Sequence, residues 1–364
     1  FPYTTLFRSN NFSLRNVTKL KHWAPIPSGD GQRLALNIQA NGLRYQSYSF
    51  SFTEPWLGGR RPNSLTVSLS KVVSRNVIGD ISIGHLKING GSVSFGRRLT
   101  WPDDNFTLIH SLSYYNYDIK DYAVFENFTT GTSNNISLVN TFARNSINSP
   151  IYPLRGSSVS LSVNLTPPYS LFRDIDFSTA TPAERFKWVE FHKWMFDASW
   201  FLKLAGNLVL NARTHYGFIG TYSDKMEQGP FERFRLGGSG LGAGNFLVGT
   251  DFIGLRGYDD QSVITAASAE RGGVAFNKFV LELRHPVTLN PAATVFGLVF
   301  AEAGNNFGSL NVYDPFNLKR SVGVGARVFM PAFGLLGFDY GYGFDNVPGS
   351  KKGQFHFMIG QQLR

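Results

Sequence analysis

The sequence predicts an all-β protein, and more specifically an antiparallel β-barrel that crosses a membrane with its strands. Apolar and polar residues alternate in many short segments, which is typical of strands that have one apolar and one polar face. The composition includes 33 Phe and 15 Tyr, which favour strands, and 38 Gly, which disfavours helix, among 364 residues. No apolar run reaches the roughly 18 residues that a membrane helix needs. The chain therefore either avoids membranes or crosses one as strands.

The alternation recurs along the chain past residue 30. In the first clear segment Leu34, Leu36 and Ile38 alternate with polar residues. About fourteen segments can be read, each near the length expected of a tilted membrane strand. They lie at 33–40, 47–52, 65–70, 92–96, 106–114, 133–144, 157–166, 194–204, 208–216, 279–284, 294–304, 322–330, 336–342 and 355–363.

A soluble β-sandwich also alternates, so alternation alone does not separate it from a membrane barrel. Three further features favour the barrel. No linker divides the chain, although a sandwich of this many strands would usually split into domains. Short turns such as Gly206-Asn207 alternate with long polar loops such as 167–185 and 221–275, and aromatic residues recur near segment ends like an interfacial girdle. We interpret residues 10–364 as a single barrel domain.

Two stretches stand outside the alternating pattern. Phe1–Ser9 lacks the apolar region and the cleavage site of a signal peptide, and it shares little with the pattern that follows. We interpret it as either foreign to the protein or disordered. Thr181–Glu184 has the spacing of a capping box, which predicts a short helical turn.

Composition and motif spacing indicate no enzymatic chemistry. The chain has no Cys, which excludes disulfides, thiolate metal sites and a Cys nucleophile. Its seven His residues show no ligand spacing, and Gly238-x-Gly240-x-x-Ala243 matches a dinucleotide loop only loosely, because no helical period follows it. The net charge of +10 comes from scattered pairs such as Arg97-Arg98, which argues against nucleic acid as a partner. We predict no catalytic residue, no metal and no cofactor.

The stretch from Gly229 to Asp260 is the least regular part of the chain. It holds too many glycines for a helix, and its apolar residues keep no period of two, so we predict a long loop without strands. The loop ends in a compact cluster of charged and aromatic residues. These are Leu255, Arg256, Gly257, Tyr258, Asp259 and Asp260.

One carboxylate on a later strand offers Arg256 a partner. Glu282 alternates with Leu281 and Leu283, so it faces away from the lipid. An unpaired carboxylate facing other strands is costly unless it is hydrated or matched with a cation, and a guanidinium binds a carboxylate bidentately. The alternative, in which Arg256 points into solvent from an exposed loop, fits the residues equally well.

These residues resemble a known family. Leu255-Arg256-Gly257-Tyr258 looks like the signature loop of the BamA family, the barrel-assembly insertases of the outer membrane. The wider superfamily includes chloroplast and mitochondrial relatives and two-partner secretion transporters. The resemblance covers roughly residues 10–363. Its other matches are Thr53-Glu54-Pro55-Trp56, Pro230-Phe231-Glu232-Arg233-Phe234 with Gly237-Gly238, Phe300-Ala301-Glu302-Ala303-Gly304, and the C-terminal segment from Phe355 to Leu363.

The resemblance implies a barrel of sixteen strands with the loop 221–275 folded into its lumen, where Arg256 would meet Glu282 and Glu302. Glu302 shares its phase with Leu298 and Phe300. Either those two residues also face the lumen, or a bulge shifts the phase. The matches begin at what resembles the second or third strand, so the first strand is expected to be missing or replaced.

The resemblance also implies a function. The protein would be a non-enzymatic insertase that folds β-barrel proteins and inserts them into the bacterial outer membrane through a lateral gate between its first and last strands. Its partners would be the lipid bilayer, unfolded β-barrel clients, and accessory assembly proteins that act through periplasmic POTRA domains expected outside this sequence. One side of the gate and the assembly signal would lie in the last strand, at Phe355, Phe357, Ile359, Gly360 and Leu363.

One departure from the family and two alternatives remain. The family normally ends on an aromatic residue, whereas here Leu363 holds that phase and Arg364 follows it. A polypeptide-translocating pore of the two-partner secretion type is the first alternative function. A passive porin or receptor barrel is the second, and for it the Arg256 loop tip would be accidental.

Overall fold

The structure is a computed structural model that describes most of the chain. The described residues are 3–23, 25–59, 61–79, 81–122, 128–177, 179–224, 226, 228–240, 249–264, 271–331 and 334–359. Among them, none of the helices is long and apolar enough to cross a membrane.

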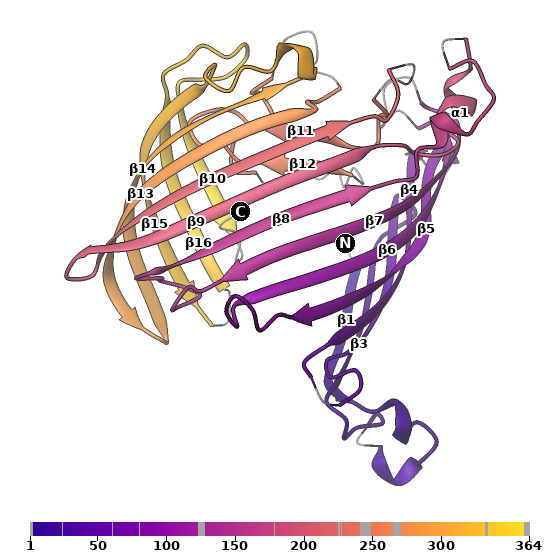
Figure 1. Cartoon of the computed structure of the whole chain (residues 1–364), viewed down its shortest axis with the longest axis horizontal. Coiled ribbons are helices and arrows are strands. Elements are labelled where there is room, and N and C mark those ends of the chain that lie inside the picture. Colours follow the sequence, from indigo (N-terminus) through magenta and orange to yellow (C-terminus); the bar gives the residue numbers. More distant parts are fainter. Residues whose placement is uncertain are drawn as a thin grey trace. The chain divides into compact units, whose positions relative to one another are not determined.

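Strands make up most of the regular structure (Figure 1). Helical segments are short and lie in the connections. The strands are β1 (Tyr3–Phe12), β2 (Gln32–Asn41), β3 (Tyr45–Glu54), β4 (Ser64–Ile78), β5 (Ile81–Arg98), β6 (Phe106–Lys120), β7 (Gly131–Asn145), β8 (Gly156–Leu165), β9 (His192–Ala205), β10 (Leu208–Gly220), β11 (Arg233–Leu236), β12 (Thr250–Ile253), β13 (Ala275–Asn290), β14 (Ala293–Phe307), β15 (Lys319–Met330), β16 (Gly334–Gly343) and β17 (Gly353–Ile359). The helical turns are η1 (Leu14–Asn16), η2 (Leu20–His22), η3 (Tyr169–Leu171), α1 (Pro182–Arg185) and η5 (Leu310–Val312).

One sheet contains 15 of the strands, in the order β1 to β10 followed by β13 to β17. Neighbours in the sheet are neighbours in the chain, except that β10 pairs directly with β13. The chain between those two strands, residues 221–274, leaves the sheet and returns to it. The predicted all-β, antiparallel fold is confirmed, and the sheet holds one strand more than the alternation alone shows.

The additional strand is β1, which includes most of Phe1–Ser9. It pairs with β2 from Tyr3 opposite Ala40 to Phe12 opposite Gln32. The residues from Tyr3 onward thus take the place of a first strand, and Phe1 and Pro2 lie outside the described residues. That Phe1–Ser9 is foreign to the protein stays a prediction.

The glycine-rich stretch contains two strands, where the sequence predicts none. β11 and β12 pair in parallel, from Arg233 opposite Thr250 to Leu236 opposite Ile253. The prediction was wrong because each strand is only four residues long, too short for a period of two to show. Their pairing joins segments that are distant in sequence, which periodicity does not report.

The chain divides into two compact units. Unit 1 comprises Phe1–Phe142, Val163–His192 and Thr221–Gly229, and unit 2 comprises Ala143–Ser162, Lys193–Gly220 and Pro230–Arg364. The single barrel domain predicted for residues 10–364 stays a prediction.

In unit 1 the connection between β8 and β9 contacts β7, where the Val189 amide donates to the Asn134 carbonyl at 2.8 Å. The rings of Phe128 and Phe186 meet edge to face at 5.9 Å. The predicted helical turn is present as α1, where Thr181 and Glu184 form a capping box.

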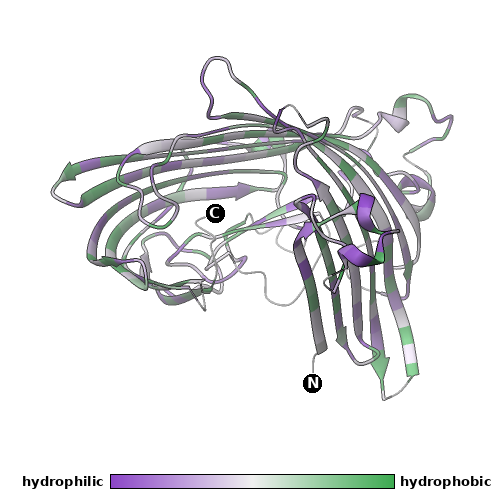
Figure 2. Ribbon diagram, turned by 90° about the horizontal axis from the view of Figure 1, so that it is seen from below, coloured by the Kyte–Doolittle hydropathy of each residue, from purple (hydrophilic) through white to green (hydrophobic). Residues whose placement is uncertain are grey.

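In unit 2 the strands keep a regular alternation that gives the sheet two distinct faces. In β16, Phe338, Tyr340 and Tyr342 are exposed, whereas Leu335 and Asp339 are buried. Figure 2 shows similar changes of hydropathy along the strands. The described part of the long loop lies against this buried face: the rings of Phe234 and Phe276 are 4.7 Å apart, and Gly257 lies on Gly341.

The core of unit 2 lies beneath this loop. Phe296, Leu298 and Phe300 project from β14 and pack with Tyr152 and Leu335. The Tyr152 hydroxyl lies 2.8 Å from the carbonyl oxygen of Asn207 and 3.0 Å from that of Arg284, so no buried polar atom of this side chain lacks a partner. Phe300, at one end of this core, supports the site described next.

Candidate functional site

The candidate site is the tip of the long loop, Leu255–Tyr258, which is buried against β13 to β17. The two arms of the loop hold each other, because the Gly237 amide donates to the Ile253 carbonyl and the Leu255 amide donates to the Gly238 carbonyl, both at 3.0 Å. Leu255, Arg256 and Tyr258 are all buried. Hydrogen bonds between the two arms therefore hold the described part of the loop together, and its tip is buried.

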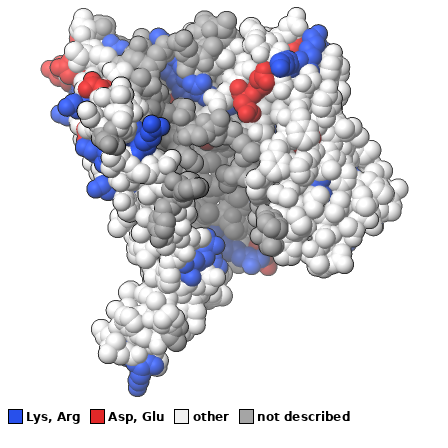
Figure 3. All heavy atoms as spheres, turned by 180° about the vertical axis from the view of Figure 1, so that it is seen from behind, with Lys and Arg blue, Asp and Glu red and all other residues white. Residues whose placement is uncertain are grey.

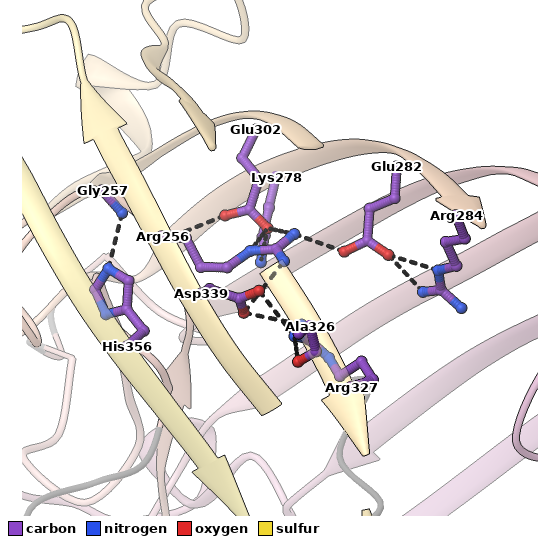
Figure 4. A network of polar contacts seen from close by, with 10 residues as sticks. All are labelled: Arg256, Gly257, Lys278, Glu282, Arg284, Glu302, Ala326, Arg327, Asp339 and His356. Carbon is purple, nitrogen blue, oxygen red and sulfur yellow. Dashed lines mark hydrogen bonds and ion pairs between the residues drawn. The ribbon is translucent and has the colours of Figure 1, made fainter. Parts of the chain in front are cut away.

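Arg256 lies at the centre of a cluster of charged side chains (Figure 4). Its Nη2 is 2.6 Å from Oε1 of Glu282 and 2.7 Å from Oε1 of Glu302. Its Nε and its backbone amide also donate to the two oxygens of Glu302, at 2.9 and 2.7 Å, and Nη1 is 3.4 Å from Oδ2 of Asp339. Its side chain is only 7% exposed, so the alternative in which it points into solvent does not describe this structure.

Each carboxylate also has a cation of its own on the strands. Arg284 contacts Glu282, with its Nε at 2.8 Å from Oε2. Arg327 donates to both oxygens of Asp339 at 2.8 Å, and Lys278 Nζ is 3.4 Å from Glu302 Oε1. Without Arg256, the strands therefore carry three carboxylates and three cations that contact them. Arg256 is the fourth cation and the one that all three carboxylates share.

The aromatic ring of Phe300 forms the floor under Arg256. The guanidinium carbon lies 3.6 Å from the ring centroid, a close cation–π contact. Leu298, Phe300 and Glu302 are all buried on one face of β14, and the pairing of β13 with β14 has no register shift in this region. Of the two alternatives for the phase of Glu302, the inward-facing neighbours therefore describe the structure, and no bulge is needed.

Glycines allow the tip to lie directly on the sheet. Gly257 has φ +92°, a conformation that residues with a Cβ rarely adopt. A Cβ added to Gly341 would lie 2.6 Å from the Gly257 nitrogen, and one added to Gly343 would lie 2.7 Å from the Gly257 oxygen. Because those neighbours are backbone atoms, they cannot rotate away. The glycines of β16 are thus the surface on which the tip rests.

Two further contacts join the tip to the end of the chain. The Gly257 amide donates to Nε2 of His356 in β17 at 2.9 Å, and the Tyr258 hydroxyl donates to the Arg320 carbonyl at 2.6 Å. Burial raises the pKa of Tyr258 to about 12, so it stays a neutral donor. Arg320 in turn holds the pKa of the Asp345 carboxyl below its usual range by hydrogen bonding to it.

A second ionic contact anchors the base of the loop. Lys193 in β9 places its Nζ 2.6 Å from Oε2 of Glu232 and 2.6 Å from Oδ2 of Asp251. Glu232 directly precedes β11 and Asp251 lies in β12, so one lysine holds both strands of the small sheet. The loop is therefore fixed to the strands of unit 2 at its base and at its tip.

The predicted residues of the last strand lie on the opposite face from the site. Phe355, Phe357 and Ile359 are all exposed, while His356 between them is buried. Gly360 and Leu363 lie outside the described residues.

Sequence reasoning singles out Arg256, Glu282 and Glu302 but misses the rest of the cluster. The missed residues are Lys278, Arg284, Arg327, Asp339 and His356 on the strands, with Lys193 and Asp251 at the base. A signal for some of them exists, because Arg284 follows Glu282 at the two-residue spacing of one strand face. Asp339 is likewise a lone carboxylate between Phe338 and Tyr340. Which cation pairs with which carboxylate depends on strand register, which the sequence does not reveal.

The cluster is suited to holding a position. Every carboxylate already binds at least two cations, which leaves none available as a general base or metal ligand. Within the described ranges, no group of three or more His, Asp or Glu side chains could hold a metal ion.

The comparison with known families decides the membership. The Omp85 superfamily domain matches residues 28–363 of the chain. The chain belongs to the Omp85 superfamily. No curated protein sequence matches this Omp85 chain.

Solved structures share the Omp85 barrel fold. BamA from Haemophilus ducreyi, in a form lacking POTRA domains 1–3, superposes with a TM-score of 0.68 at 17% identity over 98% of this chain and 66% of that one. CdiB from Escherichia coli has a TM-score of 0.58 at 11% identity, and CdiB from Acinetobacter baumannii 0.52 at 12%. Each CdiB match covers 98% of this chain, but only 58% and 56% of the CdiB chains. The chain thus spans less than two thirds of the length of these proteins.

Proposed function

We propose that this chain is the membrane barrel of an insertase, which folds β-barrel proteins and inserts them into the bacterial outer membrane. The observation that carries the proposal is the bridge made by the loop tip. Arg256 contacts carboxylates on β13, β14 and β16, and Gly257 bonds to β17. Membership of the Omp85 superfamily and the fold shared with BamA support it.

In this proposal β17 forms one side of a lateral gate and templates client strands. It is the last strand in the sheet order, and an end strand with a free edge presents unpaired backbone groups that pair with another strand. Its exposed Phe355, Phe357 and Ile359 continue the apolar face on which a client would align its own apolar residues. The bond from Gly257 to His356 holds β17 against the loop while the client pairs.

Insertion then needs no nucleotide and no catalytic group. Strand pairing satisfies the backbone of the client, and burial of its apolar face in lipid supplies the driving force. The partners are unfolded β-barrel clients and the bilayer. Accessory assembly proteins would act through periplasmic POTRA domains of the full-length protein.

The alternative is a polypeptide-translocating pore of the same superfamily, and the fold shared with the two CdiB proteins favours it. In a pore the loop would have to leave the lumen to open a path. A passive porin or receptor is less well supported, because it gives the buried Arg256 cluster no role.

Depletion of the full-length protein in its host separates these functions. Loss of many outer-membrane barrels supports the insertase, whereas loss of one secreted protein with normal barrel content supports the pore. Altered solute uptake alone would indicate a porin. Complementation then connects the function to the site: Arg256→Ala should fail to restore barrel content, and the exposed Arg44→Ala should restore it. Full rescue by Arg256→Ala would remove the loop tip from the mechanism.

A further inference from the structure

In the connection between β1 and β2, the described residues 13–23 and 25–31 form a folded loop that exposes apolar side chains. Leu14, Val17, Leu20 and Trp23 all point to the outside, and Leu20 is 78% exposed. The loop contains η1 and η2 and extends beyond the ends of the neighbouring strands of unit 1 (Figure 1, indigo). Apolar side chains in such a position usually mark an interaction surface when they are held there by the fold.

Hydrogen bonds do hold this loop in shape. The Ser13 hydroxyl donates to Asp30 Oδ2 at 2.6 Å, and the Leu14 amide donates to Gln32 Oε1 at 2.7 Å. The Asn16 side chain reaches across the loop to the Ser28 carbonyl at 3.0 Å. Trp23 gives its indole N–H to the Val17 carbonyl at 3.3 Å. The exposure of the apolar residues is therefore a property of the folded loop.

The charge of the loop has one sign. Arg15, Lys19 and Lys21 stand among the apolar residues, and no Asp or Glu occurs before Asp30. Asp30 itself accepts the bond from Ser13. The face of this projection visible in Figure 3 shows blue spheres at its tip and no red ones. A partner for this surface must therefore be anionic as well as partly apolar.

Two further connections at the same end of the strands also contain an exposed tryptophan. Because β1 to β6 are antiparallel, the β1–β2, β3–β4 and β5–β6 connections lie at one edge of unit 1. The second presents the exposed Trp56, and the third presents Trp101, which is 82% exposed. Tryptophan is enriched where a protein meets the headgroup region of a bilayer, because its ring is apolar and its N–H is polar.

We propose that this edge of unit 1, led by residues 13–23, docks on the phosphate headgroups of an anionic phospholipid surface. Lysine is depleted from protein–protein interfaces but attracted to anionic lipid, so the basic and apolar residues of this loop fit a lipid surface better than a protein partner. The proposal rests on the membrane location that the proposed function requires. It goes beyond that function by assigning a lipid-binding role to a loop distant in sequence from the tip.

A single fluorescent label tests the docking, because the chain has no Cys of its own. Leu20→Cys carries an environment-sensitive dye, and the chain is folded into vesicles of phosphatidylcholine with or without phosphatidylglycerol. Leu43→Cys, exposed at the opposite edge, is the matched control, and Leu69→Cys on the exposed face of β4 reports insertion itself. We expect the label at 20 to shift to the blue and to be quenched by brominated lipid, more strongly with phosphatidylglycerol.

Changing Arg15, Lys19 and Lys21 to Ser should abolish the phosphatidylglycerol effect at 20 and leave the signals at 43 and 69 unchanged. In one outcome, aqueous iodide quenches the label at position 20 in both kinds of vesicle while brominated lipid quenches the label at position 69. That outcome overturns the proposal and favours a protein partner for this loop. An identical response with and without phosphatidylglycerol overturns the anionic specificity. If 69 also stays in water, the membrane location and with it the proposed function fail.

Discussion

The backbone amide of Gly257 lies 2.9 Å from Nε2 of His356 and donates a hydrogen bond to it. One bond therefore connects the tip of the loop with the last strand, 99 residues later in the chain. His356 is buried, whereas Phe355 and Phe357 on either side of it are exposed. The strand therefore holds the loop with one face and leaves the other face exposed.

Replacing His356 should loosen both partners of this bond. In His356→Ala the Gly257 amide loses its acceptor in a buried place, which costs about 1–3 kcal/mol, or roughly 5- to 150-fold in an opening equilibrium. We expect faster hydrogen exchange in residues 254–260 and in 353–359. His356→Gln keeps an acceptor near the position of Nε2 and should recover most of the protection. Equal exchange in all three proteins would mean that the bond does not couple the tip to β17.

Arg256→Ala should release the tip while the sheet stays folded. Glu282, Glu302 and Asp339 each keep a cation on the strands, so the strands remain balanced without the loop. Breaking a buried ionic contact costs about 3–5 kcal/mol, and here the cost falls on docking of the loop. Limited proteolysis should cut the loop faster, while the folded band on an unheated gel persists. Arg256→Lys should dock only partly, because one ammonium cannot replace a planar guanidinium that contacts three carboxylates.

The sequence predicts the strands of this protein better than its site, and the reasons are physical. Alternation is local, so segments such as 336–342 can be read from one stretch of chain. It even places Glu282 on the buried face, where the structure has it. The parallel pairing of β11 with β12 and the contact of Lys193 with Asp251 depend on which distant segments meet, and no local pattern contains that information. His356 is similar: its phase is readable, but its partner is a backbone amide that any residue except proline could supply.

Glycine at position 341 should be required for docking of the tip. The Cβ of Gly341→Ala would approach the Gly257 nitrogen to 2.6 Å, so either the tip or β16 must move. We expect the loop of this variant to be cut by protease almost as readily as that of Arg256→Ala. Gly297→Ala in β14 is the matched control, since its Cβ would meet nothing closer than 3.9 Å. A Gly341→Ala protein as resistant as the control would show that the tip can shift without penalty.

The two anchors of the loop differ in their charge balance. Among the described residues, four cations contact three carboxylates at the tip, whereas at the base Lys193 contacts both Glu232 and Asp251. The base therefore carries an excess of negative charge, in which the Glu232 carboxylate is buried and the Asp251 side chain is 38% exposed. Consistent with this, burial raises the pKa of the Glu232 carboxyl above its usual range despite the contact with Lys193.

Lys193→Met should destabilise the base of the loop in a pH-dependent way. Without the ammonium, ionised Glu232 is a buried charge without a partner cation. Removing the ammonium therefore costs about 3–5 kcal/mol at neutral pH. A carboxyl whose folded-state pKa lies above its unfolded value weakens the fold when ionised, and this penalty fades as the pH falls through the folded pKa. Hydrogen exchange of residues 233–236 in Lys193→Met should therefore slow between about pH 7 and pH 5, toward the wild-type rate after correction for intrinsic exchange.

Lys203→Met, an exposed change on the same strand, provides the control and should behave as wild type at both pH values. Adding Glu232→Gln to Lys193→Met removes the titrating group, so the double variant should be protected at neutral pH and lose the pH dependence. Residues 233–236 of Lys193→Met could instead exchange equally fast at both pH values, with no rescue by Glu232→Gln. In that case the ionic contact contributes little, and the lysine stabilises the loop by packing against Phe234. Its Nζ lies 5.4 Å from the centroid of that ring.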